Sequence, residues 1–168
     1  MARSKYTAFV KRAVELGAKE AKIIAAESII TAAWVRMKCR YGCGGYKSSL
    51  CCPPHSPTPE ETQRVIDCYE KALLVHCEDD VDVTKLIVKL EREIFLSGYQ
   101  KALGFGAGPC RLCRECDESG CKHPEKARPS MEACGIDVFG TVRCNGYPIE
   151  VVKDTGSDEN YYGMVLIE

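Results

Sequence analysis

Cys110-Arg-Leu-Cys-Arg-Glu-Cys-Asp-Glu-Ser-Gly-Cys121 is the stretch around which this chain is predicted to be organised. Its four cysteines have the spacing C-x2-C-x2-C-x4-C, and they follow a glycine-rich segment at residues 104–108. One short loop with this spacing can direct several thiolates at a single point, as a metal ion or an iron–sulfur cluster requires. The stretch therefore predicts a metal-binding loop.

The spacing favours an iron–sulfur cluster. Bacterial ferredoxins use C-x2-C-x2-C-x3-C-P, in which three cysteines bind one cluster and the fourth binds another. Cys110, Cys113 and Cys116 match the first three positions, whereas Cys121 comes one residue late. Cys121 either closes the same cluster or crosses to a second one. Zinc is the alternative metal, followed by disulfides or free thiols, because spacing alone does not identify the metal.

A second cysteine group precedes this stretch, at Cys39, Cys43 and Cys52. Glycines between these cysteines and the pair Pro53-Pro54 predict a shaped loop instead of a helix or strand. Three thiolates are one short of a closed site. The candidates for a fourth ligand are Cys134, His55, Cys51 and Cys144. A cluster held by only three cysteines would leave one iron open to substrate, which is how a redox enzyme could arise.

Basic residues accompany both groups. The first group is flanked by Arg36, Lys38, Arg40 and Lys47, and the second by Arg111, Arg114, Lys122 and Arg128. Because a thiolate-ligated cluster is negatively charged, nearby cations would stabilise it. We expect Arg111, Arg114, His123 and Arg128 to surround the ligands without binding the metal. A solvated basic loop or a phosphate-binding surface would have the same composition.

The composition limits the compartment and the partners. The chain has 12 cysteines in 168 residues, and its N-terminus lacks the apolar core of a signal peptide. Cysteine clusters in a reducing compartment indicate metal more often than disulfides, so a cytoplasmic protein is expected. Lysine and arginine number 23 against 24 acidic residues, which gives nucleic acid no support as a partner. The longest apolar stretch, residues 23–35, is too short to span a bilayer.

Hydrophobic periodicity predicts an α+β fold. Residues 58–61 form a capping box at the start of a helix that runs to about residue 69, and Asp82 caps a long helix that ends at Gly104. Further helices are expected at residues 6–17 and 29–37, with one or two short ones in 130–144. Buried strands are expected at residues 21–26 and 72–76, and residues 149–152 and 161–167 resemble a hairpin with a turn at 154–160.

These elements predict one domain over residues 1–168, in which helices pack on a small mixed sheet. Two cysteine-rich loops, about 38–58 and 104–138, would lie at one end of it. Cys68 and Cys77 fall in apolar segments, and we expect both to be small core residues.

Four motifs resemble a known family. They are Lys38-Cys-Arg-Tyr-Gly-Cys-Gly-Gly-Tyr46, Cys52-Pro-Pro54, Gly108-Pro-Cys-Arg-Leu-Cys113 and Arg128-Pro-Ser-Met-Glu-Ala-Cys-Gly-Ile-Asp-Val138. They are similar to the prokaryotic predicted metal-binding proteins, domain of unknown function 2284. The resemblance implies a ligand set of Cys39, Cys43, Cys52, Cys110, Cys113, Cys116, Cys121 and Cys134, with Cys134 as the fourth ligand of the first group. Cys51 and Cys144 lie outside the motifs.

Three functions fit this sequence. The first is a cytoplasmic protein of an anaerobic prokaryote that carries electrons, or activates a redox partner protein, through one or two 4Fe–4S clusters. The second is a structural zinc protein whose loops bind a partner, and the third is a redox enzyme with an open cluster iron. None of them requires nucleic acid or a membrane.

Overall fold

The computed structural model describes residues 2–78, 80–154 and 159–168. In chain order its elements are α1 (Ala2–Glu15), β1 (Glu20–Ala25), the 3-10 helix η1 (Ala26–Ser28), α2 (Ala33–Gly42), α3 (Pro59–Ile66), β2 (Lys71–Cys77), α4 (Val83–Leu96), β3 (Leu103–Phe105), the 3-10 helix η2 (Glu132–Cys134), α5 (Val138–Cys144) and β4 (Tyr161–Leu166). The predicted α+β class is confirmed.

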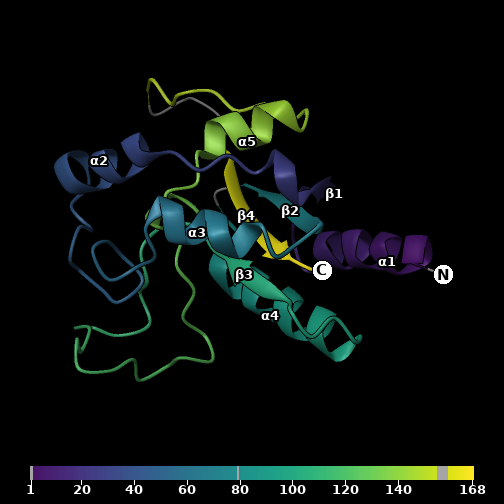
Figure 1. Cartoon of the computed structure of the whole chain (residues 1–168), viewed down its shortest axis with the longest axis horizontal. Helices are drawn as coiled ribbons and strands as arrows, with labels where there is room; N and C mark the ends of the chain where they lie inside the picture. Colours follow the sequence, from purple (N-terminus) through teal and green to yellow (C-terminus); the bar gives the residue numbers. More distant parts are fainter. Residues whose placement is uncertain (1, 79, 155–158) are drawn as a thin grey trace.

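The four strands form one sheet in the order β1-β2-β4-β3 (Figure 1). Every pairing between these strands is antiparallel, so the expectation of a mixed sheet was wrong. The strands β2 and β3 do run in the same direction, as strands joined by a long helix such as α4 can. They are not neighbours, however, because β4 lies between them and pairs with both.

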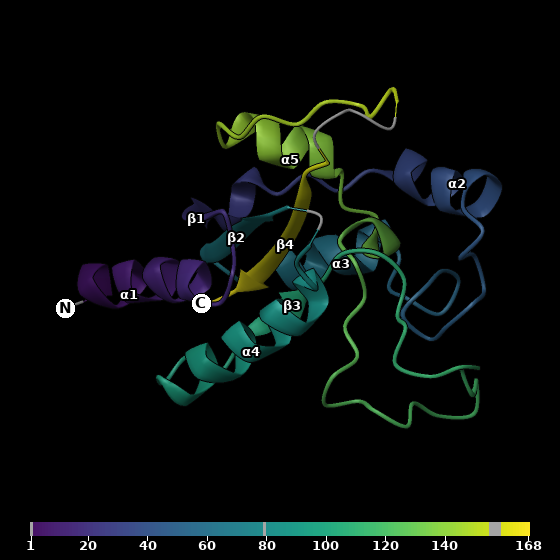
Figure 2. The ribbon, with the colours of Figure 1, turned by 180° about the vertical axis from the view of Figure 1, so that it is seen from behind.

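Helices cover both faces of the sheet (Figures 1 and 2). On one face, Leu73 and Val75 pack with residues of α1 and α4. On the other, Ala72 and Leu74 pack with residues of α3 and α5 and with the segment around η2. The central strand β2 is therefore buried on both sides, which explains the continuous apolar run that predicted it.

Two helix starts were predicted correctly. Thr58 and Glu61 form the expected capping box of α3, and the Asp82 side chain accepts a hydrogen bond from Lys85 N at the start of α4. The helix α4 ends earlier than predicted, at Leu96, where Gly98 turns the chain with a φ of 101°. Residues 103–105, expected to finish that helix, instead form β3.

The predicted hairpin was wrong. Residues 149–152 form no strand, and Ile149 packs in the core beside Tyr147. The strand β4 pairs with β2 and β3 instead, and most of the predicted turn lies outside the described residues. The second helix also begins later than expected, at Ala33, because Ile30 O and Ala32 N bond to Asp137 N and Gly135 O.

The cysteine-rich segments leave the sheet at one end. One joins α2 to α3 and the other joins β3 to η2, and they lie side by side in both views (Figures 1 and 2). We refer to residues 43–58 as the first loop and to residues 107–129 as the second loop. No helix in the described parts of the chain is long and apolar enough to cross a membrane.

Candidate metal centre

The second loop is closed at its base by backbone contacts. Gly106 N donates to Pro129 O at 2.9 Å, and Met131 N donates to Gly106 O at 3.3 Å. A Cβ atom at position 106 would lie 2.3 Å from Thr84 Oγ1, so only glycine fits against α4 there. The loop thus begins and ends on the rigid edge of the sheet.

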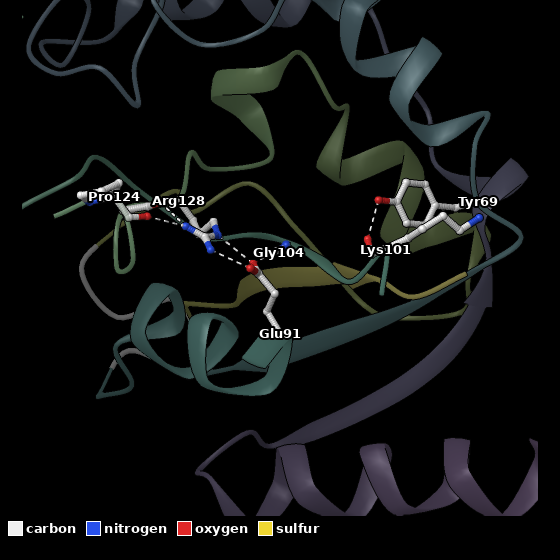
Figure 3. A network of polar contacts seen from close by, with 7 residues as sticks. Tyr69, Glu91, Lys101, Gly104, Pro124 and Arg128 are labelled. Carbon is white, nitrogen blue, oxygen red and sulfur yellow. Dashed lines mark hydrogen bonds and ion pairs between the residues drawn. The ribbon is translucent and has the colours of Figure 1, made fainter. Parts of the chain in front are cut away.

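An ion pair secures the end of the second loop (Figure 3). Arg128 donates from Nε to Glu91 Oε2 at 2.7 Å and from Nη2 to Glu91 Oε1 at 2.6 Å. Glu91 Oε2 also accepts from Gly104 N at 2.7 Å, and Arg128 Nη1 donates to Pro124 O at 3.0 Å. The carboxylate of one α4 residue therefore joins the helix, β3 and the loop. Tyr69 and Lys101 make a separate contact nearby, from the tyrosine hydroxyl to the lysine carbonyl at 2.5 Å.

A second arginine secures the first loop. Arg36 lies on α2, and its guanidinium donates to Pro57 O at 2.6 Å, Ser56 O at 3.0 Å and Ala133 O at 3.0 Å. Ser56 is buried, and its hydroxyl also donates to Ala133 O. These bonds draw α2, the first loop and η2 together, and with them Cys39, Cys52 and Cys134. Spacing in the sequence could not reveal this role of Arg36.

The two loops enclose a hollow of about 520 Å³. Gly44, Gly45 and residues 48–51 of the first loop line one side, and residues 109–110, 112–117 and 120–123 of the second loop line the other. Its lining includes all four cysteines of residues 110–121, namely Cys110, Cys113, Cys116 and Cys121, and one cysteine of the first loop, Cys51. The structure thus gathers five thiols from two distant segments around one space.

Cys51 faces the second loop. Its thiol interacts electrostatically with those of Cys110 and Cys121. The neighbouring amide, Leu50 N, donates to Cys116 Sγ at 3.4 Å. Backbone amides that donate to sulfur stabilise thiolates and are one means by which proteins tune iron–sulfur clusters.

The remaining predicted ligands form a second set beside the hollow. Cys39 interacts electrostatically with Cys43 and Cys52. Gly45 N donates to Cys43 Sγ at 3.3 Å, and Ser48 Oγ contacts Cys52 Sγ at 3.8 Å. Cys134 is completely buried and interacts with Arg36 and Cys51.

Burial disfavours the charged form of several of these thiols. Burial is the main cause that raises the pKa of Cys51 to about 12, and neighbouring Cys110 adds to it. Burial likewise raises the pKa of Cys134 to about 12 and that of Cys39 above its ordinary value. These thiols are protonated at neutral pH, so a metal would have to displace protons to bind them.

The donor chemistry fits a metal that prefers sulfur. Thiolates select zinc and iron–sulfur clusters over magnesium or calcium. Within residues 2–78, 80–154 and 159–168, no three histidine, cysteine, aspartate or glutamate side chains stand close enough to hold an ion as they are. The thiols are gathered by the loops, and a bound metal would have to draw them into a closed set.

Other residues singled out in the sequence lie elsewhere or play smaller parts. Cys77 is buried in the core as predicted, but Cys68 is exposed, because it follows α3 and its thiol donates to Arg64 O. Cys144 lies on α5, where its thiol donates to Thr141 O at 3.2 Å. His55 Nε2 lies 3.8 Å from Glu118 Oε1 and so links the two loops.

The residues expected to surround the ligands do not all line the hollow. Arg114 and His123 line the hollow. Arg128 forms the ion pair described above and also interacts electrostatically with Cys51. Arg111 is exposed and does not line the hollow.

Residues 22–167 match the family described as predicted metal-binding protein, domain of unknown function 2284. The chain belongs to this family. The match includes both loops, α2 and η2, and therefore every thiol of the two sets. Neither a curated protein nor a solved structure matches this predicted metal-binding protein.

Proposed function

We propose that this protein binds one or two 4Fe–4S clusters in its two loops, and that it transfers electrons to a redox partner or activates it in the cytoplasm. The observation that carries this proposal is the hollow lined by five cysteines. When bound, the cluster would supply one-electron chemistry. The protein's residues would hold it, exclude water from its buried side and set its potential.

Three features of the loops support iron and sulfide. The hollow offers more thiols than the four that one cluster needs, so ligation by cysteine alone is possible. Amides at Gly45 and Leu50 donate to cysteine sulfurs. Arg114 and Lys122 line the hollow beside Glu115 and Asp117, and the two cations would offset part of the negative charge of a cluster.

Structural zinc is the second candidate. The four cysteines of the second loop are the number that a closed tetrahedral zinc site uses. In that case the loops would present a surface to a partner, without redox activity. The set of Cys39, Cys43 and Cys52 supports a third reading, a redox enzyme whose cluster keeps one iron open to substrate.

The exposed face of α2 supports a protein partner. Trp34, Met37 and Tyr41 lie one turn or two apart on this helix, and all three are more than half exposed. Lys38 and Arg40 are exposed beside them, and the sequence has no acidic residue between Glu27 and Glu60. An apolar face bordered by cations suits an acidic redox protein, which it would attract electrostatically. Cys39 and Cys43 are close by, at the end of the same helix.

Anaerobic purification tests the function directly. Iron, acid-labile sulfide and zinc would be measured together with the electron paramagnetic resonance spectrum of the reduced protein. We expect about four iron and four sulfide per cluster and a signal that appears on reduction. A colourless protein with stoichiometric zinc would establish the second candidate instead. The variant Cys144→Ser is the control, because this cysteine lies on α5 away from both loops.

A further inference from the structure

We propose that Cys51 is the fourth ligand of a cluster whose other three ligands are Cys110, Cys113 and Cys116. The inference rests on the proposed function and adds the assignment of one ligand. It excludes one of the two alternatives left open for Cys121, namely that this cysteine closes the same cluster.

The geometry of the first loop directs Cys51 at the second loop. Cys52 N donates to Ser49 O at 3.0 Å, and Lys47 N donates to Pro53 O at 2.8 Å, so residues 47–53 form a tight turn. Cys51 N lies 3.3 Å from Ser49 Oγ, a hydroxyl that is itself buried. This turn places the Cys51 thiol on the lining of the hollow, where it interacts electrostatically with Cys110.

A second contact fixes the same relation between the loops. Leu50 N, one residue before Cys51, donates to Cys116 Sγ at 3.4 Å. The tip of the turn therefore contacts both the first and the third cysteine of the C-x2-C-x2-C run. A cluster bound to that run would lie beside the Cys51 thiol, which lines the same hollow.

The spacing in the sequence agrees with a ligand from another segment. In the ferredoxin pattern, the C-x2-C-x2-C cysteines supply three ligands and a cysteine distant in the chain supplies the fourth. Cys51 precedes Cys110 by a long segment, so it has the place of such a distant ligand. The late position of Cys121 is then no irregularity, because that cysteine is not needed to close the set.

The assignment also separates two adjacent cysteines. Cys51 contacts the hollow, whereas Cys52 is buried and interacts with Cys39 and Ser48 of the other set. One peptide bond would thus connect a ligand of one centre to a ligand of the other. Electrons would have a short covalent route between two clusters.

Two serine variants test the assignment. Cys51→Ser and Cys121→Ser would be prepared anaerobically beside the native protein, and iron, sulfide and the paramagnetic spectrum would be measured. We expect Cys51→Ser to lose about four iron and four sulfide per chain, or to keep the cluster with a changed spectrum that reports an oxygen ligand. We expect Cys121→Ser to keep the iron and sulfide of this cluster and its spectrum.

The controls separate a lost ligand from a lost fold. Melting temperatures of the metal-free proteins should agree closely, because the substitution replaces one sulfur atom with oxygen in a side chain that is only partly buried. An unchanged cluster in Cys51→Ser would overturn the inference, and so would loss of the cluster in Cys121→Ser. If native protein contains clusters that Cys110→Ser lacks, the proposed function stands whatever Cys51 does. Native protein without iron would refute the function itself.

Discussion

Arg128 and Glu91 face each other fork to fork, with two donor–acceptor distances of 2.6 and 2.7 Å. Their side chains are only 19% and 14% exposed. The pair joins the end of the second loop to α4, so the stability of the sheet and the position of the loop depend on the same contact.

Removing Glu91 should therefore be costly. Glu91→Ala leaves the Arg128 guanidinium and Gly104 N without their acceptor, and we expect a loss of about 3 kcal/mol in the free energy of unfolding. Urea denaturation of the metal-free protein measures it. Glu93→Ala is the matched control, because Glu93 makes a similar fork with Arg12 at a more exposed site and should cost less than about 1 kcal/mol. Equal losses in both variants would contradict this account.

Arg36 should control how well the cysteine-rich loops retain metal. In Arg36→Lys the positive charge remains, but one ammonium group cannot replace a guanidinium that donates to Pro57, Ser56 and Ala133. We expect weaker metal retention against a chelator and faster amide exchange in residues 52–58 and 131–135. Arg40→Lys, on the exposed side of α2, should behave like the native protein. If Arg36→Lys retained metal as well as the native protein does, the loops would not need this contact to hold metal.

Metal binding should depend on pH well above neutrality. An ordinary thiol has a pKa near 8.5, whereas those of Cys51 and Cys134 are raised to about 12. Since metal binds the thiolate, binding releases protons, and apparent affinity rises with pH until the thiols are ionised. Cobalt titrations between pH 7 and 10 measure this. An affinity that levels off near pH 8.5 would contradict the raised values.

The same raised pKa values have the opposite effect on the metal-free protein, whose stability falls as pH rises. A raised pKa means that the folded protein keeps protons that the unfolded chain has already lost. The free energy of unfolding should therefore decrease as pH rises from about 8.5 toward 12. Bound metal removes this alkaline loss, because the ligating thiols are then ionised in the folded protein as well.

The charge around α2 should govern electron transfer to an acidic partner. A double variant, Lys38→Glu with Arg40→Glu, should slow the reaction of the reduced protein with an acidic ferredoxin by roughly 10-fold or more at low salt. Metal content should not change. Lys89→Glu on α4 alters charge on an exposed site of another element and serves as the control. Rates that depend on neither salt nor these residues would remove α2 from the proposed interface.

Local chemistry explains which parts of the fold were predictable. The capping box at Thr58 and Glu61, and the cap at Asp82, depend on residues three apart, so they are visible in the sequence. The buried strand β2 was equally visible as an apolar run. By contrast, β3 has three residues centred on Gly104, and it is a strand because β4 pairs with it. Such pairing depends on partners distant in the chain, which a local pattern does not contain.

The same difference between local and distant contacts explains which parts of the candidate site were predictable. Residues 110–121 were recognisable as a metal-binding loop because their four cysteines are close in sequence, and all four line one hollow. Cys51 was only one of several candidates for a fourth ligand, and its place opposite Cys110 depends on the turn at residues 47–53. Arg36 and Glu91 were missed as organising residues because each bonds to two segments that are distant from it in the sequence.

The position of β4 has a consequence for the order of events in the cell. This strand occupies an inner place in the sheet, yet the ribosome makes it after both cysteine loops. Until residues 161–166 emerge, β3 has no strand to pair with, and the second loop starts from an unanchored segment. The thiols are thus translated long before the scaffold that gathers them exists. Nascent chains that stop before β4 should therefore not retain metal.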